Sequence, residues 1–424
     1  MMGEETAIAG HREVSGFYGW RLIGALWLIL CLTFSVPMYG GGVIYSSMAA
    51  ARHLSASSLG LAFTVLALMT GLPGPAIAWV IGRFGARWTM LAGNLLMACG
   101  AIALATLPAI GGAASATIFG VTIGLGVAGG GLLGAQVLAA RWFERDRARA
   151  MALMFTSAGI GGFFAPAAFN AVIEHFGSWR AGWWLLALLA VISALIVLLT
   201  VREFPSDLGQ VPDGRPPEAG KAMTAAAGSS WTVDAALRSR GFWTVIFTGA
   251  AFNGALTFLL AHSIIHLRQF GAGAGEAAMA IATIAIASLA GKILLGWIGS
   301  RVPLRHCWAA AMLLLASGLL LAIHPMAVHG IYLFPVLCGL GIGVSLVCVS
   351  ALPAELFGAR VFAALLGVSL LLQTVASALS PFLAGMAFDL FGGYRIVLIV
   401  LAALCGMAAV LLATLRVPAP PVKE

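Results

Sequence analysis

The chain has 424 residues, of which 61% are hydrophobic and only 9% are charged, and its formal net charge is +8. Soluble domains carry about 25% charged residues, so this composition excludes a water-soluble fold and predicts a protein that crosses a lipid bilayer many times. The basic surplus lies in short loops between apolar segments, which is typical of membrane topology and not of a face that binds nucleic acid.

Twelve apolar runs are each long enough for an α-helix to cross about 30 Å of hydrocarbon, which takes about 20 residues. We expect membrane-spanning helices at residues 21–45, 57–81, 88–108, 114–140, 150–174, 181–201, 240–266, 275–299, 306–324, 329–353, 362–388 and 394–416. Prolines inside these runs, such as Pro37, Pro73 and Pro75, are expected to kink the helices. The predicted fold class is an all-α membrane protein.

The longest polar interval, residues 202–239, follows the sixth run and contains four prolines with charges of both signs. It is typical of a linker between two halves. The halves share a pattern, because Trp79, Arg83 and Arg87 recur 218 residues later as Trp297, Arg301 and Arg305. This repeat predicts two six-helix bundles around a central cavity. We expect an N-terminal segment at residues 1–20, bundles at 21–201 and 240–416, the linker at 202–239 and a tail at 417–424.

The lysines and arginines predict the orientation in the membrane. If both termini lie on one side, 18 of these cations fall on that side and four on the other. Cytoplasmic loops carry an excess of Lys and Arg, so both termini are expected in the cytoplasm. The short loops and the absence of a visible targeting sequence favour the inner membrane of a bacterium, and we expect a monomer.

Several motifs resemble those of the major facilitator superfamily, and within it the branch of monocarboxylate transporters and oxalate/formate antiporters. They include Phe17-Tyr18-Gly19-Trp20-Arg21, Arg141-Trp142-Phe143, Pro205-x-Asp207-x-Gly209, Phe242-Trp243 and Gly291-Lys292. The resemblance implies a secondary transporter that works by alternating access, with proton symport as the usual coupling in this branch.

The chain also departs from the patterns of that family. Gly82 and Ser300 occupy positions where the superfamily typically has aspartates, although the neighbouring arginines remain. Ser288 stands where the animal carriers have an aspartate one turn before the cation, and span eleven offers only Gln373 where oxalate-type members have a second cation. A gate built on those carboxylates is therefore in doubt.

Lys292 is the only cation that lies away from the ends of a predicted span, and no Asp or Glu lies near the middle of any span. A charge at the bilayer centre costs about 2.5–3.5 kcal/mol, so an embedded lysine indicates a function by default. A cavity with a buried cation and no acid favours an anion, and one cation suits one carboxylate. The alternative is that Lys292 extends its ammonium toward the interface or pairs with carbonyls at a helix end.

Other polar side chains in the spans could complete a substrate site. We expect Asn253 and Gln373 to be the best polar ligands, followed by Tyr39, Ser288 and His262. Each of these could instead form a hydrogen bond between helices, and His262 could sense protons or simply lie in the interface. We expect arginines at the cytoplasmic loops to act in gating, namely Arg83, Arg87, Arg301, Arg305, Arg141 and Arg147.

The leading hypothesis is a secondary active transporter of a small organic anion that works by alternating access and is coupled to protons. Because one cation suits one carboxylate, we expect that anion to be a monocarboxylate. The alternatives are an exporter of an amphiphilic drug or metabolite, with Lys292 in a structural role, or an anion exchanger. The sequence shows no cluster of His, Asp or Glu at one membrane face, so we expect no enzyme activity, no cofactor and no metal site.

Overall fold

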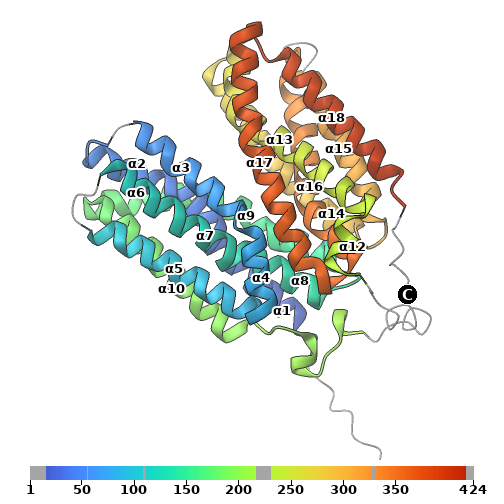
Figure 1. The fold of residues 1–424 in the computed structure, drawn as a ribbon. Helices are drawn as coiled ribbons and strands as arrows, with labels where there is room; N and C mark the ends of the chain where they lie inside the picture. Colours follow the sequence, from blue (N-terminus) through green and yellow to red (C-terminus); the bar gives the residue numbers. More distant parts are fainter. Residues whose placement is uncertain (1–15, 55, 108–110, 216–230, 326–329, 417–424) are drawn as a thin grey trace, which may run out of the picture.

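The computed structural model describes residues 16–54, 56–107, 111–215, 231–325 and 330–416 (Figure 1). Within these ranges the chain forms helices and no strands. Most of the predicted N-terminal segment, the middle of the linker and the predicted tail at 417–424 lie outside the described residues.

The first span, Gly19–Ala51, is continuous but not uniformly α-helical. It consists of α1 (Gly19–Leu30), the π-helical stretch η1 (Cys31–Gly40) and α2 (Gly41–Ala51). Pro37 lies inside η1. Proline has no N–H to donate to the preceding turn, which explains why the regular α-helical ladder is interrupted there.

The second span is bent. Its parts are α3 (Ala56–Gly71) and α4 (Gly74–Phe84), and they meet at an angle of 44°. Pro73 and Pro75 flank the first residue of α4. Prolines are tolerated in the first turn of a helix but cannot continue the one before it, so the bend follows from the sequence.

The remaining helices of the first half are α5 (Ala86–Thr106), the span Gly112–Trp142, α9 (Arg147–Phe176) and α10 (Trp179–Thr200). The span Gly112–Trp142 is built from α6 (Gly112–Ile118), η2 (Phe119–Ile123), α7 (Gly124–Val127), η3 (Ala128–Leu132) and α8 (Leu133–Trp142). Its η3 turn is glycine-rich, which allows the Asn94 side chain on α5 to donate a hydrogen bond to the Gly130 carbonyl at 2.8 Å.

The second half follows short helical turns in the linker, η4 (Pro205–Leu208), η5 (Pro212–Gly214) and α12 (Val233–Leu237). Its long helices are α13 (Arg240–Gln269), α14 (Ala274–Ile298), α15 (Leu304–Leu321), α16 (Gly330–Phe357), α17 (Ala359–Phe391) and α18 (Arg395–Ala413). Within the described ranges, 11 helices are long and apolar enough to cross a membrane, or 12 when the bent pair counts as one span. The prediction of an all-α protein with twelve spans is thus confirmed.

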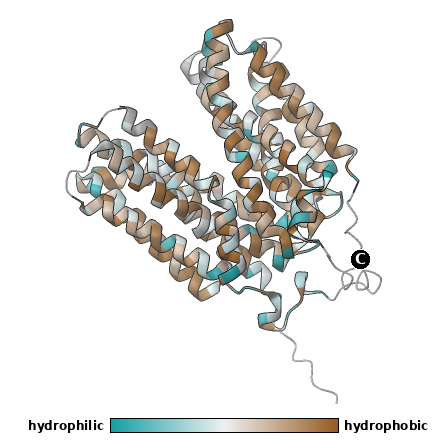
Figure 2. Cartoon of the chain, viewed as in Figure 1, coloured by the Kyte–Doolittle hydropathy of each residue, from teal (hydrophilic) through white to brown (hydrophobic). Residues whose placement is uncertain are grey.

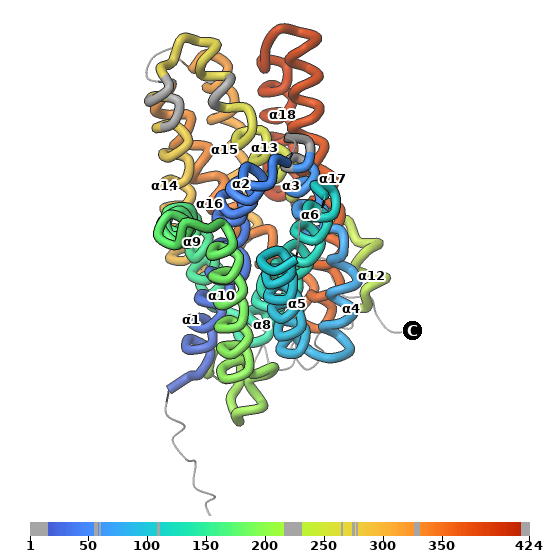
Figure 3. The backbone as a smooth tube through the Cα atoms, turned by 90° about the vertical axis from the view of Figure 1, so that its left-hand side faces the viewer, coloured from blue at the N-terminus to red at the C-terminus, as the bar shows by residue number. Residues whose placement is uncertain are grey.

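The helices form two groups, which we call the first bundle (α1–α10) and the second bundle (α13–α18) (Figure 1). The bundles approach each other at the end of the molecule that carries the linker, the linker end, and diverge toward the opposite, far end. Hydrophobic residues cover the helices, whereas hydrophilic residues gather at the linker end (Figure 2). Figure 3 shows the same arrangement from the side, with α9 and α14 on one flank of the molecule.

The bundles are packed against each other at the linker end. There α4 contacts α17 and α9 contacts α14. One hydrophobic core joins buried residues of both bundles, including Trp142, Phe155 and Phe252, whereas Tyr45 and Trp183 belong to a separate core of the first bundle. The structure therefore represents a state in which the linker end is closed.

Candidate functional site

A central cavity of about 150 Å³ lies between the bundles. The first bundle contributes residues from η1, η3, α8 and α9, and the second contributes residues from α13, α16 and α17. Most of the lining is aliphatic or aromatic, and the polar lining residues are Gln136, Asn253, Ser350 and Gln373. The full lining is Phe34, Leu132, Gln136, Phe155, Phe252, Asn253, Leu346, Val349, Ser350, Leu366, Leu370 and Gln373. A cavity of this kind suits a small organic molecule with a few directed polar contacts.

Two of the predicted ligands meet in this cavity. Asn253 on α13 donates one hydrogen bond to the Gln373 Oε1 on α17 at 3.0 Å and another to the Gly249 carbonyl at 2.9 Å. The first bond fixes the orientation of the Gln373 amide, because its oxygen accepts from Asn253. The amide nitrogen of Gln373 is then the group that remains to donate to a substrate.

Gln136 on α8 faces the cavity from the other bundle. It is buried, and its Oε1 has no hydrogen-bond partner among the described residues. Leaving a buried amide oxygen without a hydrogen bond costs free energy. A bound molecule that donates a hydrogen bond to this oxygen would remove that cost. The sequence marks Gln136 only as one of several polar residues inside a span.

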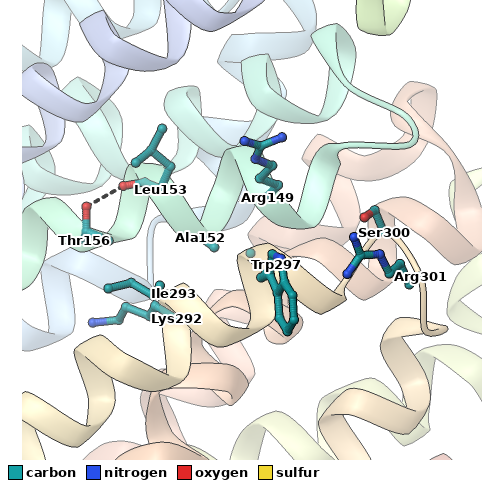
Figure 4. Close-up of a pocket in the computed structure, with 10 residues that line it drawn as sticks. Arg149, Ala152, Leu153, Thr156, Lys292, Ile293, Trp297, Ser300 and Arg301 are labelled. Atoms are coloured by element: carbon teal, nitrogen blue, oxygen red, sulfur yellow. Dashed lines mark hydrogen bonds between the residues drawn. The ribbon is translucent and has the colours of Figure 1, made fainter.

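Lys292 lies on α14 and is only 5% exposed. It does not line the central cavity. It lines a groove of about 550 Å³ between α9 and α14, together with Thr156 on α9 (Figure 4). No carboxylate pairs with its ammonium within the part of the chain that the structure describes, and no hydrogen bond to it occurs there either. In Figure 4 the side chain points away from Arg149 and Arg301 at the opposite end of the groove.

The central cavity and the end of the groove that holds Lys292 are neighbouring spaces. Phe155 lines the cavity and the next residue, Thr156, lines the groove. The contact between α9 and α14 thus separates the Lys292 ammonium from the cavity in this state.

The other predicted ligands lie outside the residues that line the central cavity. Tyr39 on η1 is 51% exposed, and Ser288 is buried on α14 one turn from Lys292. The Nδ1 of His262 lies 2.9 Å from the Tyr394 hydroxyl, and its Nε2 lies 3.1 Å from the Pro381 carbonyl. His262 therefore ties α13 to α17 and to the start of α18 within the second bundle.

All six predicted gating arginines lie at the linker end, but most of them are anchored within their own bundle. Arg87 donates to the Leu198 carbonyl and Arg305 donates to the Leu415 carbonyl. Arg83 is exposed, and the guanidinium of Arg301 lies over the Trp297 ring at 5.1 Å from its centroid.

Arg147, another of the predicted gating arginines, interacts electrostatically with the second bundle. It is buried at the start of α9, and its Nε donates to the Phe143 carbonyl at 3.0 Å. The Glu355 carboxylate on α16 interacts electrostatically with both Arg147 and Arg305. Glu355 thus places a carboxylate near these arginines, at neither of the positions, Gly82 and Ser300, where the family pattern would have one.

Sequence comparison identifies the family. The model of the Major Facilitator Superfamily matches residues 26–267 and 257–424 of the chain. The chain belongs to the Major Facilitator Superfamily. It is a multi-pass membrane transporter and not an enzyme, and curated relatives support the monocarboxylate-transporter-like branch.

Among the relatives of this superfamily member is monocarboxylate transporter 13 of Bos taurus, which is 26% identical over 387 residues, covering 89% of this chain and 85% of the relative. The uncharacterized MFS-type transporter YcxA of Bacillus subtilis (strain 168) is 23% identical over 380 residues, covering 86% and 87% of the two chains.

Two solved structures show the same fold. The E. coli fucose:proton symporter FucP matches with a TM-score of 0.71 at 14% identity, covering 94% of this chain and 99% of that one. The human organic anion transporter MFSD10 matches with a TM-score of 0.68 at 17% identity, covering 93% and 99%. These likenesses concern the superfamily fold alone.

Two acidic residues that the sequence analysis did not select organise the linker end of this transporter. Glu203 accepts hydrogen bonds from the backbone N–H groups of Ala86 at 2.8 Å and Arg87 at 3.3 Å, and it pairs with Arg141. It therefore caps the N-terminus of α5, where a carboxylate is favoured by the unpaired N–H groups and the helix dipole.

Asp213 anchors the loop that leads into α9. Its carboxylate accepts from the backbone N–H groups of Glu144, Arg145 and Asp146, at 3.0, 2.8 and 3.3 Å. Asp213 has a φ of 58°, which the Pro-Asp-Gly turn of the linker allows. That turn is the signal in the sequence from which this anchor could have been suspected.

Proposed function

We propose that this transporter carries a small organic anion, a monocarboxylate, by alternating access of the two bundles. The observation that carries the proposal is the buried Lys292 ammonium, which has neither a carboxylate nor a hydrogen-bond partner among the described residues. A buried charge without a partner is expensive, so a ligand that brings one negative charge lowers the free energy of the site.

The organic part of the substrate binds in the central cavity. Its walls offer Phe34, Phe155 and Phe252 to an apolar chain, and Asn253 and Gln373 to a hydroxyl or keto group. The central cavity and the groove that holds Lys292 are neighbours, because the consecutive residues Phe155 and Thr156 line one space each. A movement of α14 relative to α9 therefore brings Lys292 to the carboxylate. The apolar walls favour an acid with more carbon than oxalate or formate.

The curated relatives add support from their names, since two mammalian relatives of about this length are called monocarboxylate transporters 13 and 12. The organic anion transporter MFSD10 shares the fold at 17% identity. We further propose that the bundles are residues 21–201 and 240–416, that the linker end faces the cytoplasm of a bacterium across its inner membrane, and that the protein acts as a monomer.

Proton coupling is part of the proposal. None of the residues that line the central cavity is an acid. The proton therefore travels with the substrate or on Lys292, because a neutral lysine removes the cost of returning an empty charged site through the membrane. His262 is a weaker candidate, since both of its ring nitrogens already face Tyr394 and Pro381.

The test is uptake into proteoliposomes of labelled lactate, pyruvate, oxalate, formate and longer acids. Lys292→Gln removes the charge. Arg416→Gln, the matched control, removes a charge from an exposed position just after α18. A hydrogen bond to a charged group contributes about 1.5–3 kcal/mol, so Lys292→Gln should reduce kcat/KM about 10- to 150-fold. Uptake by Lys292→Gln at the wild-type rate and with the wild-type pH dependence would refute the proposal.

A second candidate function is export of an amphiphilic drug or metabolite, with Lys292 in a structural role. The predominance of aromatic and aliphatic side chains in the central cavity favours it. This alternative predicts that amines or neutral amphiphiles compete for the site better than acids do. A thermal-shift screen of matched acids and amines separates the two functions.

A further inference from the structure

The groove between α9 and α14 extends well beyond Lys292. At its other end, nearer the linker, the lining residues are Arg149 on α9 with Ser300 and Arg301 after α14 (Figure 4). This end joins one basic side chain from each bundle. The central cavity does not include any of these residues.

Each of the two arginines lies over a tryptophan ring. The Arg149 guanidinium lies over the Trp20 ring at 5.2 Å from its centroid, and that of Arg301 lies over the Trp297 ring at 5.1 Å. Throughout residues 16–54, 56–107, 111–215, 231–325 and 330–416, no carboxylate forms an ion pair with either of them. Guanidinium groups bind phosphate oxygens through two parallel hydrogen bonds, so either side chain is suited to a phosphate.

The walls of the groove are apolar and open to the flank of the molecule. Leu153 on α9 and Ile293 on α14 are exposed, and Trp297 is 65% exposed. In a membrane-spanning chain such exposed apolar side chains face hydrocarbon, and tryptophan favours the level of the lipid headgroups. A free phosphate ion gains nothing from these walls, whereas the acyl chains of a lipid bury them.

We propose that this end of the groove is a binding site for an anionic phospholipid, whose phosphate bridges Arg149 and Arg301 and whose acyl chains lie along Leu153, Ile293 and Trp297. Basic pockets between membrane helices bind anionic headgroups by charge complementarity. Because Arg149 belongs to the first bundle and Arg301 to the second, the bound lipid holds the bundles together at the linker end. It thereby favours the state in which this end is closed.

This site is separate from the proposed substrate contact. The Lys292 side chain points away from both arginines, which lie toward the other end of the groove (Figure 4). The lipid proposal therefore does not depend on which substrate the transporter carries, and the two can fail independently.

The experiment measures lipid binding by the full-length protein. Purified protein is titrated in detergent with dioleoylphosphatidylglycerol or dioleoylphosphatidylcholine, and binding is followed by native mass spectrometry and by the thermal unfolding midpoint. Arg149→Gln/Arg301→Gln is compared with Arg21→Gln/Arg416→Gln, which removes the same charge from exposed positions outside the groove. Inorganic phosphate and glycerol 3-phosphate serve as probes for a free anion.

We expect the wild type to prefer phosphatidylglycerol. The groove double variant should lose about 30-fold in affinity for it and each single variant about fivefold, given the usual contribution of a basic residue to anionic-lipid binding. The control double variant should stay within about threefold of the wild type, because its arginines lie outside the groove. Equal losses in the two double variants, no loss in the groove variant, or equal protection by inorganic phosphate would each overturn the proposal.

Discussion

The contact between Gly74 on α4 and Gly367 on α17 provides a way to shift the protein between its two access states. A Cβ atom added at Gly367 would lie 2.5 Å from the Gly74 carbonyl oxygen and 2.8 Å from the Ala78 Cβ. Ordinary contacts of this kind are about 3.4–4 Å. Gly367→Val therefore requires the bundles to separate at the linker end, where they are closed in this structure.

The size of the effect follows from the cost of overpacking. Adding carbon atoms to a well-packed contact typically costs about 1–3 kcal/mol, which corresponds to a 5- to 150-fold shift between the two states. The cost falls on the state with a closed linker end, because opening that end relieves the contact. We expect Gly367→Val to favour the state that is open at the linker end and closed at the far end.

The assay is the distance between spin labels at the far end of the two bundles. Exposed residues Thr106, at the end of α5, and Gln269, at the end of α13, are changed to cysteine in a background without the native cysteines. The label distance should shorten in Gly367→Val. Gly385→Val is the matched control, since it lies on the same helix and a Cβ there has no neighbour within 4 Å. An unchanged or longer distance in Gly367→Val, or the same shift in the control, would refute the reasoning.

Two further predictions concern the cavity and the linker end. Gln373→Leu removes the amide that Asn253 orients and should raise KM about 5- to 10-fold in the uptake assay. Thr257→Val, one turn along α13 and outside the cavity lining, should leave KM unchanged, and an equal effect of both changes would contradict the role of the amide. Glu203→Ala removes the cap of α5 and the partner of Arg141 and should lower stability by about 1–2 kcal/mol. A thermal unfolding midpoint of Glu203→Ala equal to that of the wild type would contradict the role of Glu203 as a helix cap.

The course of the spans could be predicted from the sequence because the bilayer imposes a length on every apolar run. The bend between α3 and α4 also follows from Pro73 and Pro75. The π-helical turns η1, η2 and η3 could not be predicted, since an apolar pattern does not distinguish i→i+5 from i→i+4 hydrogen bonds.

The site was predictable only in part. The polar residues inside the spans point to Asn253, Gln373 and Lys292. Which of them meet in one cavity depends on which faces of α13, α14 and α17 turn inward, and a single sequence does not fix that rotation. Neither the cap Glu203 nor the loop anchor Asp213 could be predicted from the linker, because their partners are backbone N–H groups more than 60 residues away. Such long-range partners leave no local pattern.

The central claim is that the buried Lys292 ammonium, which has no partner among the described residues, binds a carboxylate. The most direct measurement compares the binding of the best acid of the uptake panel with that of its neutral amide, for the wild type and for Lys292→Gln. We expect the wild type to prefer the acid by at least about tenfold and the variant to bind acid and amide equally. An equal preference for the acid in both proteins, or none in the wild type, would contradict the claim.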